Sequence, residues 1–375
     1  MENKSEMFSE LIGQAKAKRR LAFYLNGYNA TGICPHIMFI APKGCGKTMM
    51  AKAMGKLLIA DEPHVYFNEA GEEVIEHGRA KTFLEINCST LKNVKQLVNQ
   101  VLVPHVAHKE VTILFDECSE LPRDITMALL TCLNPNKENK TSFSYDDYTI
   151  DFDFTRHTFM FATTEAQSVF HALMDRCERV DLEEYTYNEL GKIVQLTLPS
   201  VKFEDGLLDK IATVLRGNAR AAQKMANNMS IFLKAKKSKE FTEEDWKEIK
   251  FQLGIAPLGL SPIEIQILGE LGKVKDCSLT HLAAKTGLTK ACVQRDFEMY
   301  LQKMSLMQIT TAGRAITKEG ADYLEDLEKI KQDEETHVET KAAPVRIELP
   351  KIFDTNVDLE CEVGNEIIAK EYLKN

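Results

Sequence analysis

The stretch that decides the fold runs from His36 to Met54 and reads HIMFIAPKGCGKTMMAKAM. Ile37 to Ile40 form an apolar run of strand length, residues 41–46 contain proline and two glycines, and apolar residues recur at helical spacing from Lys47 onward. A strand, a glycine loop and Gly-Lys-Thr opening a helix make up the phosphate-loop pattern. The glycines let backbone N–H groups turn inward around a phosphate, and the helix N-terminus adds a partial positive charge. The stretch therefore predicts a nucleotide site.

Within this loop we expect Lys47 to reach the β- and γ-phosphates and the Thr48 hydroxyl to ligate Mg²⁺. Ala41 stands where the pattern usually has its first glycine, which is a mild departure at the edge of the loop. The alternative is a chance Gly-Lys-Thr before an ordinary helix. The residues expected to contact nucleotide here are Pro42, Lys43, Gly44, Cys45, Gly46, Lys47, Thr48 and Met49.

A second nucleotide signature follows at residues 111–117, where the strand-like run VTILF ends in Asp116 and Glu117. The strand end would place Asp116 near the Mg²⁺ shell, and Glu117 could polarise the attacking water. A hydrophobic strand ending in two acids is common by chance. Its pairing with the upstream loop strongly favours an ATPase.

Length and composition limit the class of protein. The 375 residues predict two to three domains, and no run approaches the roughly 20 apolar residues that span a bilayer. The polar N-terminus has no secretory signal, and the nine cysteines include no Cys-x-x-Cys pair. These features predict a reduced, cytoplasmic protein without a zinc site, a disulfide framework or a membrane segment.

The net charge of −9 at first argues against binding to nucleic acid. Residues 331–375, however, hold eleven acids and six bases, so this tail alone contributes −5. The other 330 residues share only −4. The overall charge therefore neither supports nor excludes DNA binding through a local patch.

The order of elements predicts an α/β fold with four parts. Strands alternate with helices up to about residue 184, which is typical of a doubly wound parallel sheet with its ligand at the carboxyl ends of the strands. We expect only helices over 185–255, a winged helix of three helices and a β-ribbon over 256–330, and an acidic, mobile tail over 331–375. Residues 61–80 read as an inserted loop or hairpin.

The chain resembles the RuvB family of AAA+ ATPases, the branch-migration motors of Holliday junctions, over roughly residues 8–325. The similar stretches are FSELIGQ at 8–14, the two nucleotide signatures, FATTE at 161–165, LMDR at 173–176, RGNAR at 216–220, and the winged-helix segments LGL at 258–260 and 298–314. The resemblance implies an AAA+ ATPase domain, a helical lid and a C-terminal winged helix.

The resemblance also implies roles for individual residues. Ile12 and Gly13 would contact adenine, Thr163 would be the first sensor, Arg220 the second, and Arg176 an arginine finger. Tyr185 lies where it could pack on adenine, although packing in the core is equally compatible with the pattern. Arg314 in the wing would contact DNA, and ordinary solvated or strand-end roles remain the alternatives for these residues.

From these roles we expect a ring, a hexamer, that hydrolyses ATP with Mg²⁺ and moves duplex DNA at branched junctions. Glu117 would orient the water, Lys47 and Arg220 would balance charge, and Arg176 would act on the next subunit's nucleotide. The wing departs from the family because Ile309 and Ala312 stand at expected basic positions. A clamp-loader-like ATPase and a nucleotide-switched adaptor of a mobile element are the alternatives.

Residues 143–154, FSYDDYTIDFDF, predict a hairpin with Asp146 and Asp147 at its turn. Tyr145 would then face Tyr148, and Phe143 would face Ile150, on one aromatic side of the hairpin. The resemblance places this hairpin where the family docks its junction-binding partner, RuvA. We therefore expect Tyr145, Tyr148 and Ile150 to bind a RuvA-like protein, and packing of these side chains on the chain's own sheet is the alternative.

Overall fold

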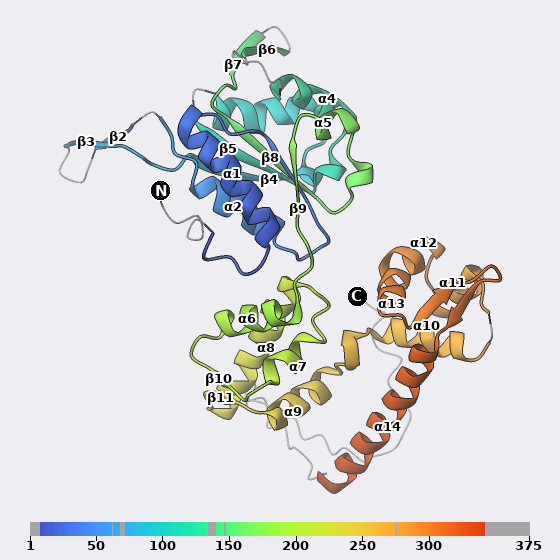
Figure 1. The fold of residues 1–375 in the computed structure, drawn as a ribbon. Coiled ribbons are helices and arrows are strands. Elements are labelled where there is room, and N and C mark those ends of the chain that lie inside the picture. Colours follow the sequence, from blue (N-terminus) through green and yellow to red (C-terminus); the bar gives the residue numbers. More distant parts are fainter. Residues whose placement is uncertain are drawn as a thin grey trace, which may run out of the picture. The chain divides into compact units, whose positions relative to one another are not determined.

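The computed structural model describes residues 8–61, 63–67, 72–107, 109–133, 140–145, 148–274 and 276–341. Its centre is a five-stranded parallel sheet in the order β4-β5-β8-β1-β9. The strands are β4 (Thr82–Asn87), β5 (Val111–Asp116), β8 (Thr158–Thr163), β1 (Ile37–Ile40) and β9 (Glu178–Asp181). The predicted α/β class and parallel sheet are thus confirmed (Figure 1).

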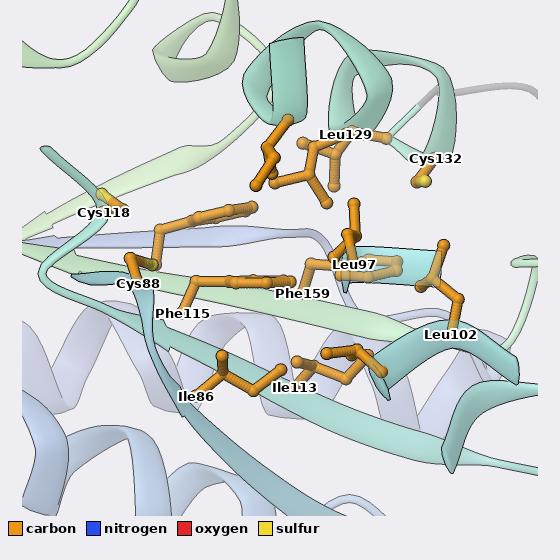
Figure 2. Close-up of a cluster of buried hydrophobic side chains, with 14 of the residues drawn as sticks. Ile86, Cys88, Leu97, Leu102, Ile113, Phe115, Cys118, Leu129, Cys132 and Phe159 are labelled. Carbon is orange, nitrogen blue, oxygen red and sulfur yellow. The ribbon is translucent and has the colours of Figure 1, made fainter. Parts of the chain in front are cut away.

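Side chains that alternate along the strands fill two cores, one on each face of this sheet. Leu114 packs with α1 (Ala15–Thr31) and α2 (Lys47–Lys56), whereas its neighbours Ile113 and Phe115 pack on the opposite face. That face is covered by α3 (Val94–Gln96), the π-helical η2 (Leu97–Val106) and α4 (Arg123–Cys132). Figure 2 shows Phe115 and Phe159 side by side beneath Leu129 of α4. Helices on both faces make the sheet doubly wound.

Two hairpins extend from the domain that is built on the five-stranded sheet (Figure 1). The predicted insertion contains β2 (His64–Phe67) paired antiparallel with β3 (Glu73–Glu76). The second hairpin pairs β6 (Lys140–Tyr145) with β7 (Tyr148–Asp153), and its register sets Tyr145 opposite Tyr148 and Phe143 opposite Ile150, as the sequence predicts. The proposed turn residues Asp146 and Asp147 lie outside the described residues.

The helical lid contains α6 (Tyr187–Thr197), α7 (Leu207–Ala212), α8 (Ala219–Lys236) and α9 (Glu243–Leu253) around one core. Two-residue strands, β10 (Lys202–Phe203) and β11 (Glu240–Phe241), also pair here, and the sequence does not predict them. Such short pairings lack the alternation by which strands are recognised. Capping boxes at Thr186 and Thr242 fix the starts of α6 and α9.

The winged helix follows, with α10 (Pro262–Gly272), α11 (Leu279–Thr286), a helix built from α12 (Lys290–Cys292), η6 (Val293–Glu298) and α13 (Met299–Lys303), and the ribbon of β12 (Met307–Ile309) and β13 (Arg314–Ile316). The last helix, α14 (Lys318–Lys341), extends to residue 341 and so includes the beginning of the segment 331–375 that the sequence predicts to be a mobile tail. The compact unit that holds the preceding elements ends within α14, at Leu327. The rest of the acidic tail, from residue 342, lies outside the described residues.

Shorter elements complete the described chain: η1 (Cys88–Thr90), η3 (Cys118–Glu120), η4 (Ala166–Ser168), α5 (His171–Met174) and η5 (Pro257–Gly259). Among the described residues, no single helix combines the length and apolarity needed to cross a membrane, although the bent pair Glu243–Gly259 and Pro262–Gly272 meets that test jointly.

Candidate nucleotide-binding and hydrolysis site

The loop between β1 and α2 requires its glycines. Gly44 and Gly46 have φ of 80° and 89°, in the left-handed region that disfavours other residues. A Cβ atom at Gly44 would lie 1.9 Å from the Oδ1 atom of Asn218, and one at Gly46 would lie 2.8 Å from the Tyr185 hydroxyl. Glycine is therefore required at both positions, by the backbone conformation of the loop and by its close packing against Asn218 and Tyr185.

Lys47 begins α2 and folds back over this loop. Its ammonium group donates hydrogen bonds to the carbonyl oxygens of Ala41, at 2.9 Å, and Pro42, at 3.2 Å. Burial lowers the pKa of Lys47 from its ordinary value, and the nearby positive charge of Arg220 acts in the same direction. This partly buried ammonium lines the mouth of the loop and is well placed to bind a phosphate there.

Thr48 and Asp116 meet at the carboxyl edge of the sheet, where the Thr48 hydroxyl donates a 2.8 Å hydrogen bond to Oδ2 of Asp116. Glu117, the next residue, has φ of 56° and donates its backbone N–H to the other oxygen of Asp116. This left-handed turn leaves the Glu117 side chain exposed beside the loop. At the edge of the sheet, the carboxylate of Asp116 is thus held by hydrogen bonds and that of Glu117 is exposed.

These groups line a cavity of ≈ 390 Å³, within the range of small-ligand sites. Thr163, at the end of β8, and Arg220, in the first turn of α8, line it as well. The predicted residues in its lining are Ile12, Lys43, Gly44, Gly46, Lys47, Thr48, Met49, Asp116, Glu117, Thr163, Tyr185 and Arg220. The structure therefore brings together most of the residues singled out in the sequence.

Four of the residues that the sequence predicts for nucleotide binding or hydrolysis lie outside the lining. Gly13 has φ of 64° and packs against Glu189 of the lid, while Pro42 and the buried Cys45 belong to the backbone of the loop. Arg176 is exposed, and its guanidinium donates to the carbonyl oxygen of Ala172 in the preceding turn. Arg176 therefore does not act on its own chain's cavity in this conformation.

Sequence reasoning assigned no role to several residues that build the cavity, although some of them lie in the stretches quoted above. Gln14 joins the N-terminal segment to the lid boundary, because its amide donates to the carbonyl of Glu183 at 2.7 Å and accepts from the N–H of Glu183 at 3.0 Å. Asn218 caps α8 by accepting from the backbone of Arg220 and Ala221. An asparagine directly before a helix is a recognised start signal, so Asn218 could have been found. Thr164, Ile193, Leu196 and Gln223 also line the cavity.

The wing arginine has a partner inside the protein. Arg314 donates from Nε to Oε1 of Glu298 at 2.8 Å and from Nη2 to Oε2 at 3.2 Å. The two side chains are 14% and 3% exposed. Most of the guanidinium is thus engaged within the winged helix, which favours a structural role over the expected contact with DNA.

The aromatic face of the second hairpin continues into the core. Phe152 and Phe154 are buried, and Ile150 packs partly buried against the same cluster. The base of this face therefore belongs to the chain's own core, in agreement with the alternative interpretation. The side chains of Tyr145 and Tyr148 lie outside the described residues, and their docking role stays a prediction.

Comparison with known families gives a consistent picture. Residues 37–185 match the model "ATPase family associated with various cellular activities (AAA)", and residues 257–325 match the "RuvB C-terminal winged helix domain". The Holliday junction branch migration complex subunit RuvB of Campylobacter hominis is 24% identical over 323 residues, which cover 84% of this chain and 88% of the relative. The subunit from Wolbachia of Drosophila simulans is 23% identical and is covered to 93%.

Solved structures agree with the fold. The Thermotoga maritima RuvB branch migration motor superposes with a TM-score of 0.65 at 20% identity and covers 85% of this chain and 96% of its own. With an AAA domain, a RuvB winged helix and low identity to the relatives, this chain is a divergent member of the RuvB-like AAA+ ATPases.

Proposed function

We propose that the chain couples ATP hydrolysis to the movement of duplex DNA through branched, Holliday-type junctions in recombination or repair. The observation that carries this proposal is one cavity that gathers Lys47, Asp116, Glu117 and Arg220 in a chain that also ends in a RuvB winged helix. Relatives along nearly the whole length are named as branch migration subunits.

The cavity fits an ATP-bound magnesium ion. Mg²⁺ prefers oxygen ligands and is usually held by one or two protein groups together with phosphates and water. The Thr48 hydroxyl and the Asp116 carboxylate, 2.8 Å apart, are such a pair. These two residues would hold Mg²⁺, which would neutralise phosphate charge when bound.

The remaining residues would divide the work of hydrolysis. Lys47 binds the terminal phosphates, and Glu117, exposed at the cavity, orients the attacking water. Arg220 balances the charge that develops on the transferred phosphoryl group. Ile12 and Tyr185 line the cavity together with Ile193 of the lid, and we assign this apolar part to adenine.

We further propose that subunits form a hexameric ring in which Arg176 completes the neighbour's site. The exposure of Arg176 and its absence from the lining of its own chain's cavity support an action in trans. An arginine supplied across an interface stabilises the transition-state charge in other phosphoryl-transfer enzymes. The second hairpin, residues 143–154, would dock a RuvA-like junction-binding protein.

DNA binding should be weak because the wing offers little positive charge. Arg314 is paired with Glu298, and Ile309 at an expected basic position is 54% exposed. The structure shows no disulfide among the cysteines that it describes, which suits the proposed cytoplasmic location. A winged helix argues against a clamp loader, whose family normally ends in a helical collar.

A synthetic four-way junction tests the proposal. The purified chain, with ATP and Mg²⁺, should dissociate the junction into duplex products, and Glu117→Gln should bind the junction without moving it. If the wild-type chain hydrolyses ATP and binds the junction but leaves it intact, with and without a RuvA-like partner, the motor assignment fails. The nucleotide-switched adaptor would then replace it.

A further inference from the structure

The turn that precedes α8 of the lid contacts the winged helix through the side chain of Arg216. This residue precedes Gly217 at the entry to α8 and has φ of 55°, a left-handed conformation that is unfavourable for a residue with a side chain. Glycine would adopt this conformation without strain, yet the residue is arginine. The contacts of the arginine side chain offset the unfavourable backbone conformation.

The guanidinium of Arg216 makes two parallel hydrogen bonds, from Nη1 to Oε2 of Glu264 at 3.1 Å and from Nη2 to Oε1 at 2.9 Å. Glu264 is fully buried. On its flat face the guanidinium lies 3.5 Å from the centroid of the Tyr300 ring. This bidentate and stacked geometry suits arginine and does not suit lysine.

Both partners are fixed parts of the winged helix. Glu264 forms the capping box of α10, because its Oε2 accepts from the backbone and hydroxyl of Ser261. Tyr300 belongs to α13, and its hydroxyl donates to the carbonyl of Leu258 at 2.7 Å. Arg216 therefore contacts two helices of the winged helix, α10 and α13.

The other side of the same turn reaches the nucleotide cavity. The N–H of Ala219 donates to the carbonyl of Gly44 in the phosphate loop at 3.0 Å, and Asn218 packs against that glycine. Arg220 lines the cavity. Five consecutive residues, 216–220, thus contact the winged helix at one end and the phosphate loop at the other.

We propose that Arg216 is a positioning residue that couples nucleotide occupancy of the cavity to DNA occupancy of the winged helix. A shift of the turn when Arg220 engages a phosphate is transmitted to α10 and α13 through the Arg216 side chain. By linkage, DNA bound to the winged helix changes nucleotide affinity by the same factor. This inference rests on the proposed function, since it presumes that both ligands bind.

Other side chains that bridge these regions are less suited to the task. The pairs Arg295–Glu165 and Lys303–Glu184 join the winged helix to the segments around residues 165 and 184. The side chains of Arg295 and Glu165 are 69% and 35% exposed, and those of Lys303 and Glu184 are 49% and 38% exposed. Exposed ion pairs are screened and are easily replaced by water. The Arg216–Glu264 pair differs because the carboxylate of Glu264 is buried, so water does not easily replace Arg216 as its partner.

The test measures the dissociation constant of a labelled four-way junction for the full-length chain, without nucleotide and with saturating ATPγS. The coupling factor is the ratio of the two constants, and allosteric coupling typically lies at about 5- to 150-fold. Arg216→Gly removes the side chain and relieves the left-handed backbone, and should bring the ratio to about 1 while ATPγS affinity without DNA stays within about twofold. Arg216→Lys should give an intermediate ratio.

Two further variants keep the test decisive. Arg216→Gly leaves the buried charge of Glu264 without its partner. The measurement is therefore repeated on the double variant Arg216→Gly/Glu264→Gln, in which the glutamine retains a capping-box acceptor and removes the charge. Glu165→Gln, which breaks the exposed pair with Arg295, is the matched control and should keep the wild-type ratio.

The measurement must also be reciprocal, because the ATPγS dissociation constant with and without junction DNA should change by the same factor and lose that change in the same variants. A merely structural role would weaken both ligands without altering the ratio. A folded Arg216→Gly/Glu264→Gln protein with the wild-type ratio, or a wild-type chain that binds both ligands with a ratio of 1, overturns the inference alone. A wild-type chain that binds neither ligand overturns the proposed function.

Discussion

The 2.8 Å hydrogen bond from the Thr48 hydroxyl to Oδ2 of Asp116 joins two residues that stand 68 positions apart in the sequence. It forms because β5 and β1 lie on either side of β8, so that α2 and the end of β5 meet at the same edge of the sheet. In a parallel sheet of this kind, the loops at the carboxyl ends of the strands form the ligand crevice. The nucleotide site is thus a direct product of the strand order.

Lys47 and Glu117 should separate binding from hydrolysis. We expect Lys47→Ala to abolish nucleotide binding, because the ammonium that covers the loop is lost. Glu117→Gln should bind ATP normally but hydrolyse it roughly 100-fold or more slowly, since a positioned group at the transition state is removed. Fluorescent-nucleotide titration and steady-state phosphate release measure the two effects, and normal turnover in Glu117→Gln would remove that residue from its role.

Arg176 should act on a neighbouring subunit. A protein with Arg176→Ala and another with Lys47→Ala should each be inactive, and mixing them should restore part of the ATPase activity. Some interfaces in a mixed ring would join an intact phosphate loop to an intact finger. As a control, Arg179→Ala changes a nearby arginine that is paired with Asp181 and should leave hydrolysis within about twofold. Mixed rings of proven composition without any recovery would contradict the assignment.

Local patterns predicted those elements whose own side chains determine them. The sequence predicts a strand over residues 82–87 and a helix over 219–235, and the structure has β4 over Thr82–Asn87 and α8 over Ala219–Lys236. These predictions hold because alternation and helical spacing are properties of neighbouring residues. Phosphate-loop residues were found for the same reason, since their chemistry lies in one continuous stretch. Arg220, which lines the cavity, was located through the resemblance alone, and Tyr185, which also lines it, through its place near the start of the lid.

Features that depend on distant partners could not be predicted. Apolar residues recur at helical spacing from Phe8 onward, which favours an earlier start of the first helix. Gly13 and Gln14 nevertheless adopt left-handed conformations, and Gln14 binds Glu183 at the boundary with the lid, so α1 begins at Ala15. The pairing of Arg314 with Glu298, sixteen residues away, likewise depends on the packing of the wing against a helix. A basic residue in a wing looks the same in sequence whether it binds DNA or a buried carboxylate.

Arg314→Ala separates these two roles. Loss of the cation would leave Glu298, 3% exposed, without its partner, and should cost about 3 kcal/mol of stability. Thermal unfolding should show this loss, and the double variant Arg314→Met/Glu298→Met should recover most of it. If Arg314 instead contacts a phosphate, the slope of junction affinity against salt should fall by about one unit in a protein of unchanged stability.

His36 should make stability depend on pH. Its Nδ1 atom accepts a hydrogen bond from the backbone N–H of Phe159 at 3.1 Å, which requires an unprotonated nitrogen. Burial lowers the pKa of His36 to about 4, with nearby His157 as the smaller cause. The unfolded chain therefore binds the proton first, and stability should fall as the pH decreases from about 6.5 to about 4.

Denaturant unfolding at several pH values measures this dependence. Because burial also lowers the pKa of His157, part of the slope should remain when only His36 is changed. His36→Asn offers an acceptor that does not titrate and should flatten the curve over this interval. An unchanged slope in a folded His36→Asn protein would show that His36 does not titrate as the structure indicates.

The hairpin of β6 and β7 should dock a partner through its outer part and support the core through its base. Its register places Tyr145 opposite Tyr148, whereas Phe152, on the same face, is buried in the core. Tyr145→Ser with Tyr148→Ser should therefore leave folding and basal ATPase activity intact and abolish stimulation by a RuvA-like partner. Phe152→Ser is the matched comparison, and it should lower the melting temperature because it removes a buried aromatic ring. A similar fall in the melting temperature of the double tyrosine variant would show that these rings also belong to the core, and the docking role would then be lost.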